Sequence, residues 1–380
     1  MGRRESPPVI RLLIVDDSAL MRKLLSAIFN EQPDFEIRVA RDGVEALAML
    51  ADDPPDVITL DVHMPRMDGL ACLDRIMIEH PCPVVMVSSL TADAADATLE
   101  ALTLGAVDFI AKPGGAISMN IHQIAPLLVE KVRAAAGARL RSSLRLAERV
   151  RHRVGTVAPR ARRRAAAAGG FAAPHPTRDI LNGDGLVLIG VSTGGPPALE
   201  TLLTALPAGF PWPILIAQHM PATFTGPLAR RLDGLCALHV MEVTEPTPLT
   251  AGTVHIGRGD ADVIVSRRAR RLVAMAAPSD RDYPWHPSAD RLVRSAMNHL
   301  PASQLIGILL TGMGSDGAAA MADLHGQGGR TIAEAKETAV VWGMPGELVA
   351  ANGADWVVPL PAIADCLRRL LPGPDDPTCR

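Results

Sequence analysis

Short apolar runs rich in β-branched residues alternate with longer stretches of helical periodicity, and this alternation occurs in two separate parts of the chain. In the first part, from Val9 to about Gly115, the apolar runs are 9–15, 57–60 and 84–87. In the second part, from Leu186 to about Leu371, they are 186–191, 214–217, 305–310 and 356–358. Such alternation is typical of βα units whose parallel sheet is covered on both faces. The pattern therefore predicts two α/β domains, each with a doubly wound parallel sheet.

The segment between the two parts is rich in arginine, alanine and proline and contains one aromatic residue, Phe171. A basic run of this kind could contact nucleic acid or acidic lipid. Because it lacks interleaved aromatic residues and a surrounding binding fold, a solvated linker is the better interpretation. We therefore divide the chain into a first domain at 9–130, a linker at 131–182 and a second domain at 183–371.

Composition narrows the class of protein only slightly. The 380 residues exceed the length of one typical domain, and 48% hydrophobic with 21% charged residues is ordinary globular composition. A net charge of -3 does not indicate a protein that binds nucleic acid through an overall positive charge. The five cysteines show no C-x-x-C spacing, and no apolar segment approaches the length of a membrane span. We expect a cytoplasmic protein without direct membrane insertion.

Polar residues follow the apolar runs of the first domain, at the strand ends where doubly wound sheets bind ligands. These residues are Asp16, Asp17, Asp61, Ser88 and Lys112. Converging carboxylates repel one another unless a cation joins them, and an all-oxygen ligand set favours magnesium. A lysine and a serine hydroxyl suit a phosphoryl oxygen. Singly, each residue could be a helix cap, a turn residue or a surface lysine, but the set of five favours a site.

The motifs V-D-D-S at 15–18, D-V-H-M-P-R-M-D-G at 61–69 and A-K-P at 111–113 resemble those of the response-regulator receiver family. The resemblance implies a flavodoxin-like (βα)5 domain that accepts a phosphoryl group on Asp61 from a histidine kinase. It also implies that Asp16 and Asp17 hold Mg²⁺ together with Asp61, with the backbone carbonyl of Met64 as a further ligand.

The same resemblance implies that Ser88 and Lys112 sense the phosphoryl group. The added negative charge can then bias a two-state surface toward a different domain contact. His63 departs from the pattern, because the related subfamily usually has an acidic residue at this place beside the acceptor. We expect His63 to tune the lifetime of the phosphoryl group.

In the second domain, the strand expected at 186–189 continues into Gly190-Val191-Ser192-Thr193-Gly194, a G-x-S-x-G sequence at a strand-to-helix junction. Such a turn can expose a serine hydroxyl above a sheet. The N–H groups of the following helix can stabilise an oxyanion. The pattern is common by chance, and Ser192 could equally be a helix cap.

A serine nucleophile needs a base, and His219 follows the expected strand at 214–217. His239 and His255 instead alternate with apolar residues, as strand surface positions do. Like Ser192, His219 has an ordinary alternative as a cap of the next helix.

Asp316 follows the run at 305–310, within Thr311-Gly312-Met313-Gly314-Ser315-Asp316-Gly317. Its carboxylate could orient His219 and support it electrostatically. The same segment matches G-x-G-x-x-G, so a dinucleotide site is the alternative. A carboxylate inside that fingerprint would repel a pyrophosphate, which favours the catalytic interpretation. The order Ser192, His219, Asp316 differs from that of common α/β-hydrolases.

Five ordered motifs across 183–371 resemble those of the chemotaxis protein-glutamate methylesterase (CheB) family. They are G-V-S-T-G-G-P-P-A-L, Q-H-M-P, H-P-S-A-D, T-G-M-G-S-D-G-A and V-V-W-G-M-P. The resemblance implies hydrolysis of methyl-glutamate on chemoreceptors and deamidation of receptor glutamines. In it Ser192 is the nucleophile, His219 the base and Asp316 the orienting acid. The residues implied to bind the oxyanion or shape the site are Met313, through its backbone N–H, Thr193 and Gly194.

We therefore expect a phosphorylation-regulated hydrolase with Mg²⁺ in the first domain and no cofactor in the second. Its expected partners are methyl-accepting chemoreceptors and a histidine kinase, without nucleic acid. Three alternatives stay open at this point. They are a non-enzymatic regulator, a DNA-binding output, and an esterase of the same chemistry that acts on a protein outside chemotaxis.

Overall fold

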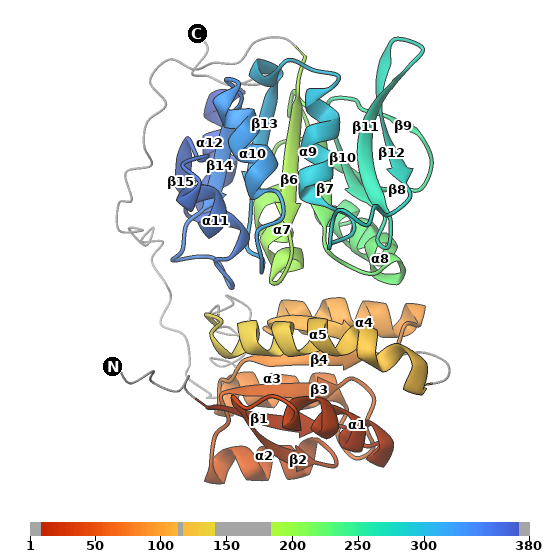
Figure 1. Ribbon diagram of the computed structural model, residues 1–380, viewed down its shortest axis with the longest axis vertical. Helices are drawn as coiled ribbons and strands as arrows, with labels where there is room; N and C mark the ends of the chain where they lie inside the picture. The colour runs from red at the N-terminus through yellow and green to blue at the C-terminus, as the bar shows by residue number, and fades with distance from the viewer. Residues whose placement is uncertain (1–8, 113–116, 141–183, 372–380) are drawn as a thin grey trace, which may run out of the picture. The chain divides into compact units, whose positions relative to one another are not determined.

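The computed structural model describes residues 9–112, 117–140 and 184–371, which form two compact units, each with its own sheet (Figure 1). Most of the expected linker and Pro113 of the A-K-P motif lie outside the described residues. The first unit ends in α5 (Ile117–Ala136), and the second begins with β6 (Leu186–Val191). Among the described residues, no helix is long and apolar enough to cross a membrane.

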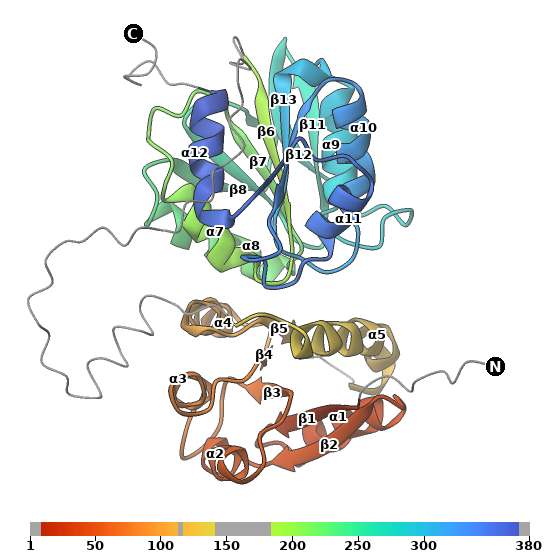
Figure 2. The same cartoon turned by 90° about the vertical axis from the view of Figure 1, so that its left-hand side faces the viewer.

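The first unit is a five-stranded parallel sheet in the order β2-β1-β3-β4-β5. Its strands are β1 (Ile10–Val15), β2 (Phe35–Ala40), β3 (Val57–Asp61), β4 (Val84–Ser88) and β5 (Asp108–Ala111). Its other helices are α1 (Ala19–Asn30), α2 (Gly43–Asp52), α3 (Gly69–Glu79) and α4 (Ala92–Leu104). In Figure 2, α2, α3 and α4 cover one face of the sheet, and α1 and α5 cover the other. The predicted (βα)5 architecture is confirmed.

Side-chain caps set where the helices of the first unit begin. Ser18, Asp42, Asp68 and Thr91 each accept a hydrogen bond from a backbone N–H in the first turn of α1, α2, α3 and α4, respectively. These bonds satisfy amides that have no partner within the helix. The caps leave the strand ends, where β1 and β3 finish, as short polar loops.

The second unit contains a seven-stranded parallel sheet in the order β15-β14-β13-β6-β7-β10-β8. The strands that follow β6 are β7 (Ile214–Gln218), β8 (His239–Val243), β10 (Thr253–Gly257), β13 (Leu305–Leu309), β14 (Arg330–Glu334) and β15 (Trp356–Val358). Every residue of β6, β7 and β13 is buried, as expected for central strands covered on both faces.

Helices lie on both faces of this sheet, as Figure 2 shows. One face carries α7 (Gly195–Leu203), α8 (Ala222–Asp233) and α12 (Leu360–Leu370). The other carries α9 (Ala289–Met297), α10 (Ala318–Gly326) and α11 (Met344–Ala350). A 3-10 turn at Ala302–Gln304 precedes β13.

A small antiparallel sheet in the order β11-β12-β9 accompanies the large one. It consists of β9 (Thr247–Pro248), β11 (Asp262–Arg268) and β12 (Arg271–Ala277), and α9 packs against β11. The chain from β12 to α9 then runs back toward the carboxyl ends of β6 and β13. This connection, residues 278–288, carries Trp285 and Ser288, which both enter the candidate site below.

Both parallel sheets reverse their strand order next to their first strand. In the first unit the reversal lies between β1 and β3, and in the second between β6 and β13. Open α/β sheets bind ligands in the crevice at this point, beyond the carboxyl ends of the strands. One expectation for a side chain was wrong. His255 lies in β10 between β7 and β8 and is 1% exposed, so it is a core residue and not a strand surface residue.

Candidate functional site

The three carboxylates expected at the strand ends of the first unit lie together. One ligand oxygen each from Asp16, Asp17 and Asp61 falls within 4.8 Å of the others. Asp16 and Asp61 are buried, whereas Asp17 is exposed. The backbone explains the cluster, because Asp16 and Asp17 follow β1 and Asp61 is the last residue of the adjacent β3.

Lys112 lies beside two of these carboxylates. Its Nζ lies 2.7 Å from Asp61 Oδ2 and 3.0 Å from Asp16 Oδ2. Burial by itself would lower the pKa of Lys112, but its ion pairs with Asp61 and Asp16 outweigh burial and raise that pKa. Burial raises the pKa of Asp61, against the opposing effect of Lys112. The three clustered carboxylates carry more formal negative charge than Lys112 alone neutralises.

These residues fit a hard divalent cation. Asp16 Oδ2 is buried, and among the described residues its contact is the ion pair with the Lys112 ammonium at 3.0 Å. An under-satisfied carboxylate oxygen beside two further carboxylates is the oxygen-only donor set that Mg²⁺ takes. Met64 is buried in the loop after β3, three residues beyond Asp61.

Ser88 ends β4 and is fully buried beside β3. Its hydroxyl accepts a hydrogen bond of 2.8 Å from Thr98 of α4. Because Ser88 is the acceptor in this bond, its own O–H can still donate to another oxygen. His63 is exposed, and its backbone N–H lies 3.4 Å from Asp61 Oδ1.

In the second unit, Ser192 lies directly after β6 on a loop fixed by its own backbone. Its N–H donates to the Thr311 carbonyl at 3.0 Å, and its carbonyl accepts from Gly195 at 2.8 Å. Gly194 has φ of 75°, and a Cβ there would lie 2.8 Å from the Val340 side chain. The tight turn therefore needs glycine at this position. Ser192 is 7% exposed, so its loop holds the hydroxyl at the edge of the buried core.

His219 occupies the corresponding place after β7. Its backbone N–H donates to the Val191 carbonyl at 3.0 Å, which puts it beside the Ser192 loop. Its Nε2 lies 2.7 Å from Asp316 Oδ2. Because a carboxylate only accepts hydrogen bonds, we assign the proton to Nε2. Nδ1 is then the basic nitrogen, and it is buried without a hydrogen-bond partner among the described residues.

Asp316 is saturated with hydrogen-bond donors. Besides His219, it accepts from the Ser288 hydroxyl at 2.9 Å and from the N–H groups of Ala289 at 2.6 Å and Asp290 at 3.0 Å. Burial by itself would raise the pKa of Asp316, but His219 and these amides lower it below its usual range. The carboxylate is thus a fixed negative charge at the start of α9, where the helix dipole favours it. A fixed anion at this place would repel a dinucleotide phosphate.

The other predicted site residues lie nearby. Thr193 is buried, and its carbonyl accepts from the Thr311 hydroxyl at 2.9 Å. Met313 is buried in the loop after β13, and its N–H finds no acceptor within the described residues. Thr311 links this loop to the Ser192 loop.

Sequence reasoning missed three side chains that contact the Ser192, His219 and Asp316 group. Gln218 is 1% exposed, and its Nε2 donates to the carbonyls of Ser192 at 3.1 Å and His219 at 3.2 Å. Ser288 caps α9 and donates to Asp316, and Trp285 stacks on His219. Gln218 and Ser288 stand in the Q-H-M-P and H-P-S-A-D motifs, so a closer consideration of those motifs could have found them. Trp285 gave no signal in the sequence.

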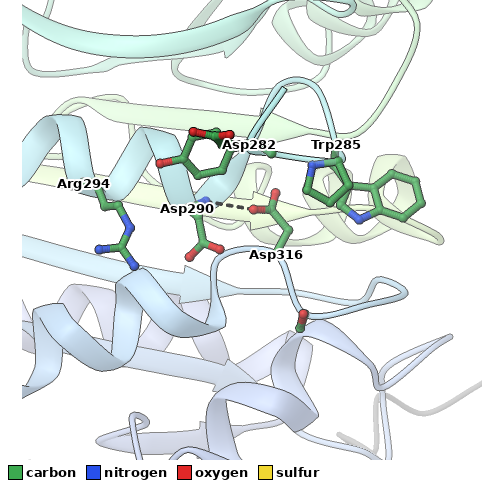
Figure 3. Close-up of a pocket in the computed structure, with 8 residues that line it drawn as sticks. Asp282, Trp285, Asp290, Arg294 and Asp316 are labelled. Atoms are coloured by element: carbon green, nitrogen blue, oxygen red, sulfur yellow. Dashed lines mark hydrogen bonds between the residues drawn. The ribbon is translucent and has the colours of Figure 1, made fainter. Parts of the chain in front are cut away.

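A cavity of about 310 Å³ adjoins Asp316 on the side of α9 (Figure 3). Its lining residues are Asp282, Tyr283, Pro284, Trp285, Asp290, Arg294, Ser315 and Asp316. Figure 3 shows Asp290 and Arg294 projecting from α9, with the Asp290 N–H directed at Asp316. Burial raises the pKa of Asp290, whose carboxylate accepts from Ala320 at the start of α10. That carboxylate therefore joins α9 to α10.

Comparison with known proteins agrees with the description of both units. Residues 12–121 match the response regulator receiver domain, and residues 187–367 match the CheB methylesterase family. A protein-glutamate methylesterase/protein-glutamine glutaminase of Rhodopseudomonas palustris (strain BisB18) is 59% identical over 356 residues, which cover 94% of this chain and 96% of that protein. A second one, from Rhodospirillum rubrum, is 53% identical over 93% of this chain and 94% of its own length.

Among solved structures, the CheB methylesterase catalytic domain of Thermotoga maritima is 35% identical, with a TM-score of 0.48; the match covers 50% of this chain and all of that one. The full-length matches extend through both units, and the resemblance inferred from the motifs is confirmed. The chain belongs to the CheB family of protein-glutamate methylesterases/protein-glutamine glutaminases.

Proposed function

We propose that this protein hydrolyses methyl esters of glutamate side chains on chemoreceptors and deamidates receptor glutamines to glutamate, under the control of phosphorylation at Asp61. One observation carries the hydrolase half. Ser192 and His219 follow adjacent strands, and His219 Nε2 lies 2.7 Å from a buried, donor-saturated Asp316. This is the arrangement of nucleophile, base and orienting acid that acyl transfer requires.

The mechanism follows from the assigned proton positions. His219 Nδ1 takes the proton of the Ser192 hydroxyl as its oxygen attacks the side-chain carbonyl. Asp316 accepts a hydrogen bond from the Nε2–H and stabilises the imidazolium that forms. His219 then gives its proton to the departing methanol or ammonia, which leaves a glutamyl ester on Ser192. Water, deprotonated by His219, attacks that ester and releases glutamate and the free serine.

The N–H of Met313 is the proposed oxyanion donor, since no acceptor within the described residues occupies it. Thr193 and Gly194 shape the turn that presents the hydroxyl. We assign this activity to a domain at 183–371, joined by the linker expected at 131–182 to a receiver domain at 9–130, whose last helix, α5, continues to Ala136.

In the receiver domain we propose Asp61 as phosphoacceptor from a histidine kinase, with Mg²⁺ held by Asp16, Asp17, Asp61 and the Met64 carbonyl. When bound, the cation supplies positive charge against the phosphoryl oxygens. Lys112 supplies the protein's own positive charge at the same place, 2.7 Å from Asp61. Ser88 would donate its hydroxyl proton to a phosphoryl oxygen while accepting from Thr98, which would couple phosphorylation to α4.

Methanol release from methylated chemoreceptors, with and without a small phosphodonor and Mg²⁺, tests the proposal. We expect Ser192→Ala to abolish release, while Ser266→Ala on β11 retains it. Asp61→Asn should keep only the rate seen without phosphodonor, while Asp52→Asn at the end of α2 responds as wild type does. Undiminished release by Ser192→Ala would refute the catalytic mechanism. A normal phosphodonor response in Asp61→Asn would refute the switch alone.

A further inference from the structure

Trp285 covers one face of the His219 ring. The two ring centroids are 5.4 Å apart and the ring planes differ by 8°, so the rings are parallel and stacked. The His219 side chain is only 6% exposed. The His219 ring therefore contacts Asp316 at its Nε2 edge and the Trp285 π-system at one of its faces.

The loop that carries Trp285 is held in place by a buried carboxylate. Asp262 accepts from the N–H groups of Asp280 at 3.3 Å and Ser288 at 2.8 Å, near the two ends of the loop. It also accepts from His286 Nδ1 at 3.0 Å, on the residue next to Trp285. An indole anchored in this way does not have to be ordered during the reaction, so its position over His219 is built into the fold.

The charge of His219 changes during the proposed reaction. Its ring is neutral before Ser192 attacks and becomes a cation when Nδ1 takes the proton. A cation within about 6 Å of an indole centroid is attracted to the ring quadrupole, and more strongly where water is excluded. A neutral imidazole gains much less. The interaction therefore strengthens as the transition state forms, which is the condition for raising kcat without changing KM.

Resting on the proposed hydrolase function, we propose that Trp285 is a positioning residue that acts through His219. Its π face stabilises the imidazolium formed during acylation and deacylation, and its flat surface fixes the ring plane that aims Nδ1 at the Ser192 hydroxyl. A purely space-filling role would require only an apolar side chain of similar volume at this position.

Substitutions at position 285 distinguish stabilisation of the imidazolium by the π face from a purely space-filling role. We expect kcat for methanol release to fall in the order Trp285, Trp285→Phe, Trp285→Leu, with the leucine variant reduced between about 2-fold and about 30-fold. KM should stay within about twofold, because the ground-state imidazole is neutral. Trp356→Leu on β15 is the matched control, since it makes the same substitution in the same unit but leaves Trp285 in place. Equal kcat values for Trp285→Phe and Trp285→Leu, or a leucine variant as fast as wild type, would overturn the proposal.

Fluorinated tryptophans placed at position 285 of the full-length chain provide a test that preserves ring size. Each added fluorine weakens the quadrupole, so log kcat should fall stepwise with fluorine number. A flat series overturns the proposal even if Trp285→Leu folds poorly.

The rate at which an organophosphonate labels Ser192 should follow the same series, because this reaction also requires His219 to take the serine proton. Labelling does not depend on receptor substrate. A fluorine-dependent labelling rate in a protein that releases no methanol would refute the proposed substrate while leaving the role of Trp285 intact. A labelling rate insensitive to fluorine would refute the role of Trp285 alone.

Discussion

Gln218→Met tests whether one buried amide holds the proposed nucleophile, Ser192, and the proposed base, His219, in register. In the native protein, Gln218 Nε2 donates to the carbonyls of Ser192 at 3.1 Å and His219 at 3.2 Å. Methionine has a similar length and no donor. The Ser192 carbonyl keeps its hydrogen bond from the Gly195 N–H. Removing the bond from Gln218 therefore costs this carbonyl about 1 kcal/mol, the net value of one hydrogen bond. The His219 carbonyl loses its side-chain donor at a partly buried position, which costs about 1–3 kcal/mol.

The expected result is a loss of about 2–4 kcal/mol in the free energy of unfolding of the second unit. All four tryptophans, Trp212, Trp285, Trp342 and Trp356, belong to that unit, so tryptophan fluorescence during urea unfolding reports on it selectively. We also expect kcat for methanol release to fall by about 10- to 100-fold, because a shift of about 1 Å between reacting groups has an effect of this size.

Gln304→Met, on the half-buried 3-10 turn before β13, is the matched control and should change stability by no more than about 0.5 kcal/mol. A Gln218→Met protein with wild-type kcat would refute the idea that this amide sets the geometry of the site. Loss of stability with unchanged kcat would limit Gln218 to a role in folding.

Two further predictions concern the charged groups. Lys112→Met should raise the pKa of Asp61 further and reduce phosphoryl uptake from a small phosphodonor by about tenfold or more, measured by radiolabel incorporation, with Lys23→Met as control. Because the folded protein lowers the pKa of Asp316 from 3.8, the stability that this group contributes is fully present above pH 3.8 and is lost as pH falls through the lower folded value. Asp316→Asn should therefore show a smaller loss of stability below pH 4 than wild type in fluorescence-monitored acid unfolding, and equal losses would contradict this assignment.

Strands buried on both faces were predictable from sequence, because every position of β6 and β13 has to be apolar or small. The β11-β12 hairpin was missed for a local reason. Its turn residues, Ala269 and Arg270, have φ of 45° and 67°, values at which glycine or asparagine is usually expected. The hairpin packs against α9 through β11, and no local pattern announces such a tertiary contact.

In the candidate site, too, contacts between segments distant in the chain could not be predicted from local sequence. Ser192, His219 and Asp316 could be inferred because each follows a parallel strand, where geometry brings strand ends together. Trp285 reaches His219 from the loop after an antiparallel strand, to which that rule does not apply. Gln218 is itself the last residue of β7, so it was taken as part of the strand. Groups that act through tertiary contacts leave no local sequence signal.

The two sites show how hydrogen-bond donors decide what a buried aspartate can do. Asp316 accepts from four donors, and its pKa lies below the usual range, so it remains a fixed anion that orients a histidine. Asp61 has Lys112 and a long contact of 3.4 Å from His63, and its pKa is raised. Its oxygen remains available to a cation or to a phosphoryl group. The same side chain at the same kind of strand end is therefore expected to be inert in one domain and reactive in the other, because four donors outweigh burial at Asp316, whereas burial outweighs Lys112 and His63 at Asp61.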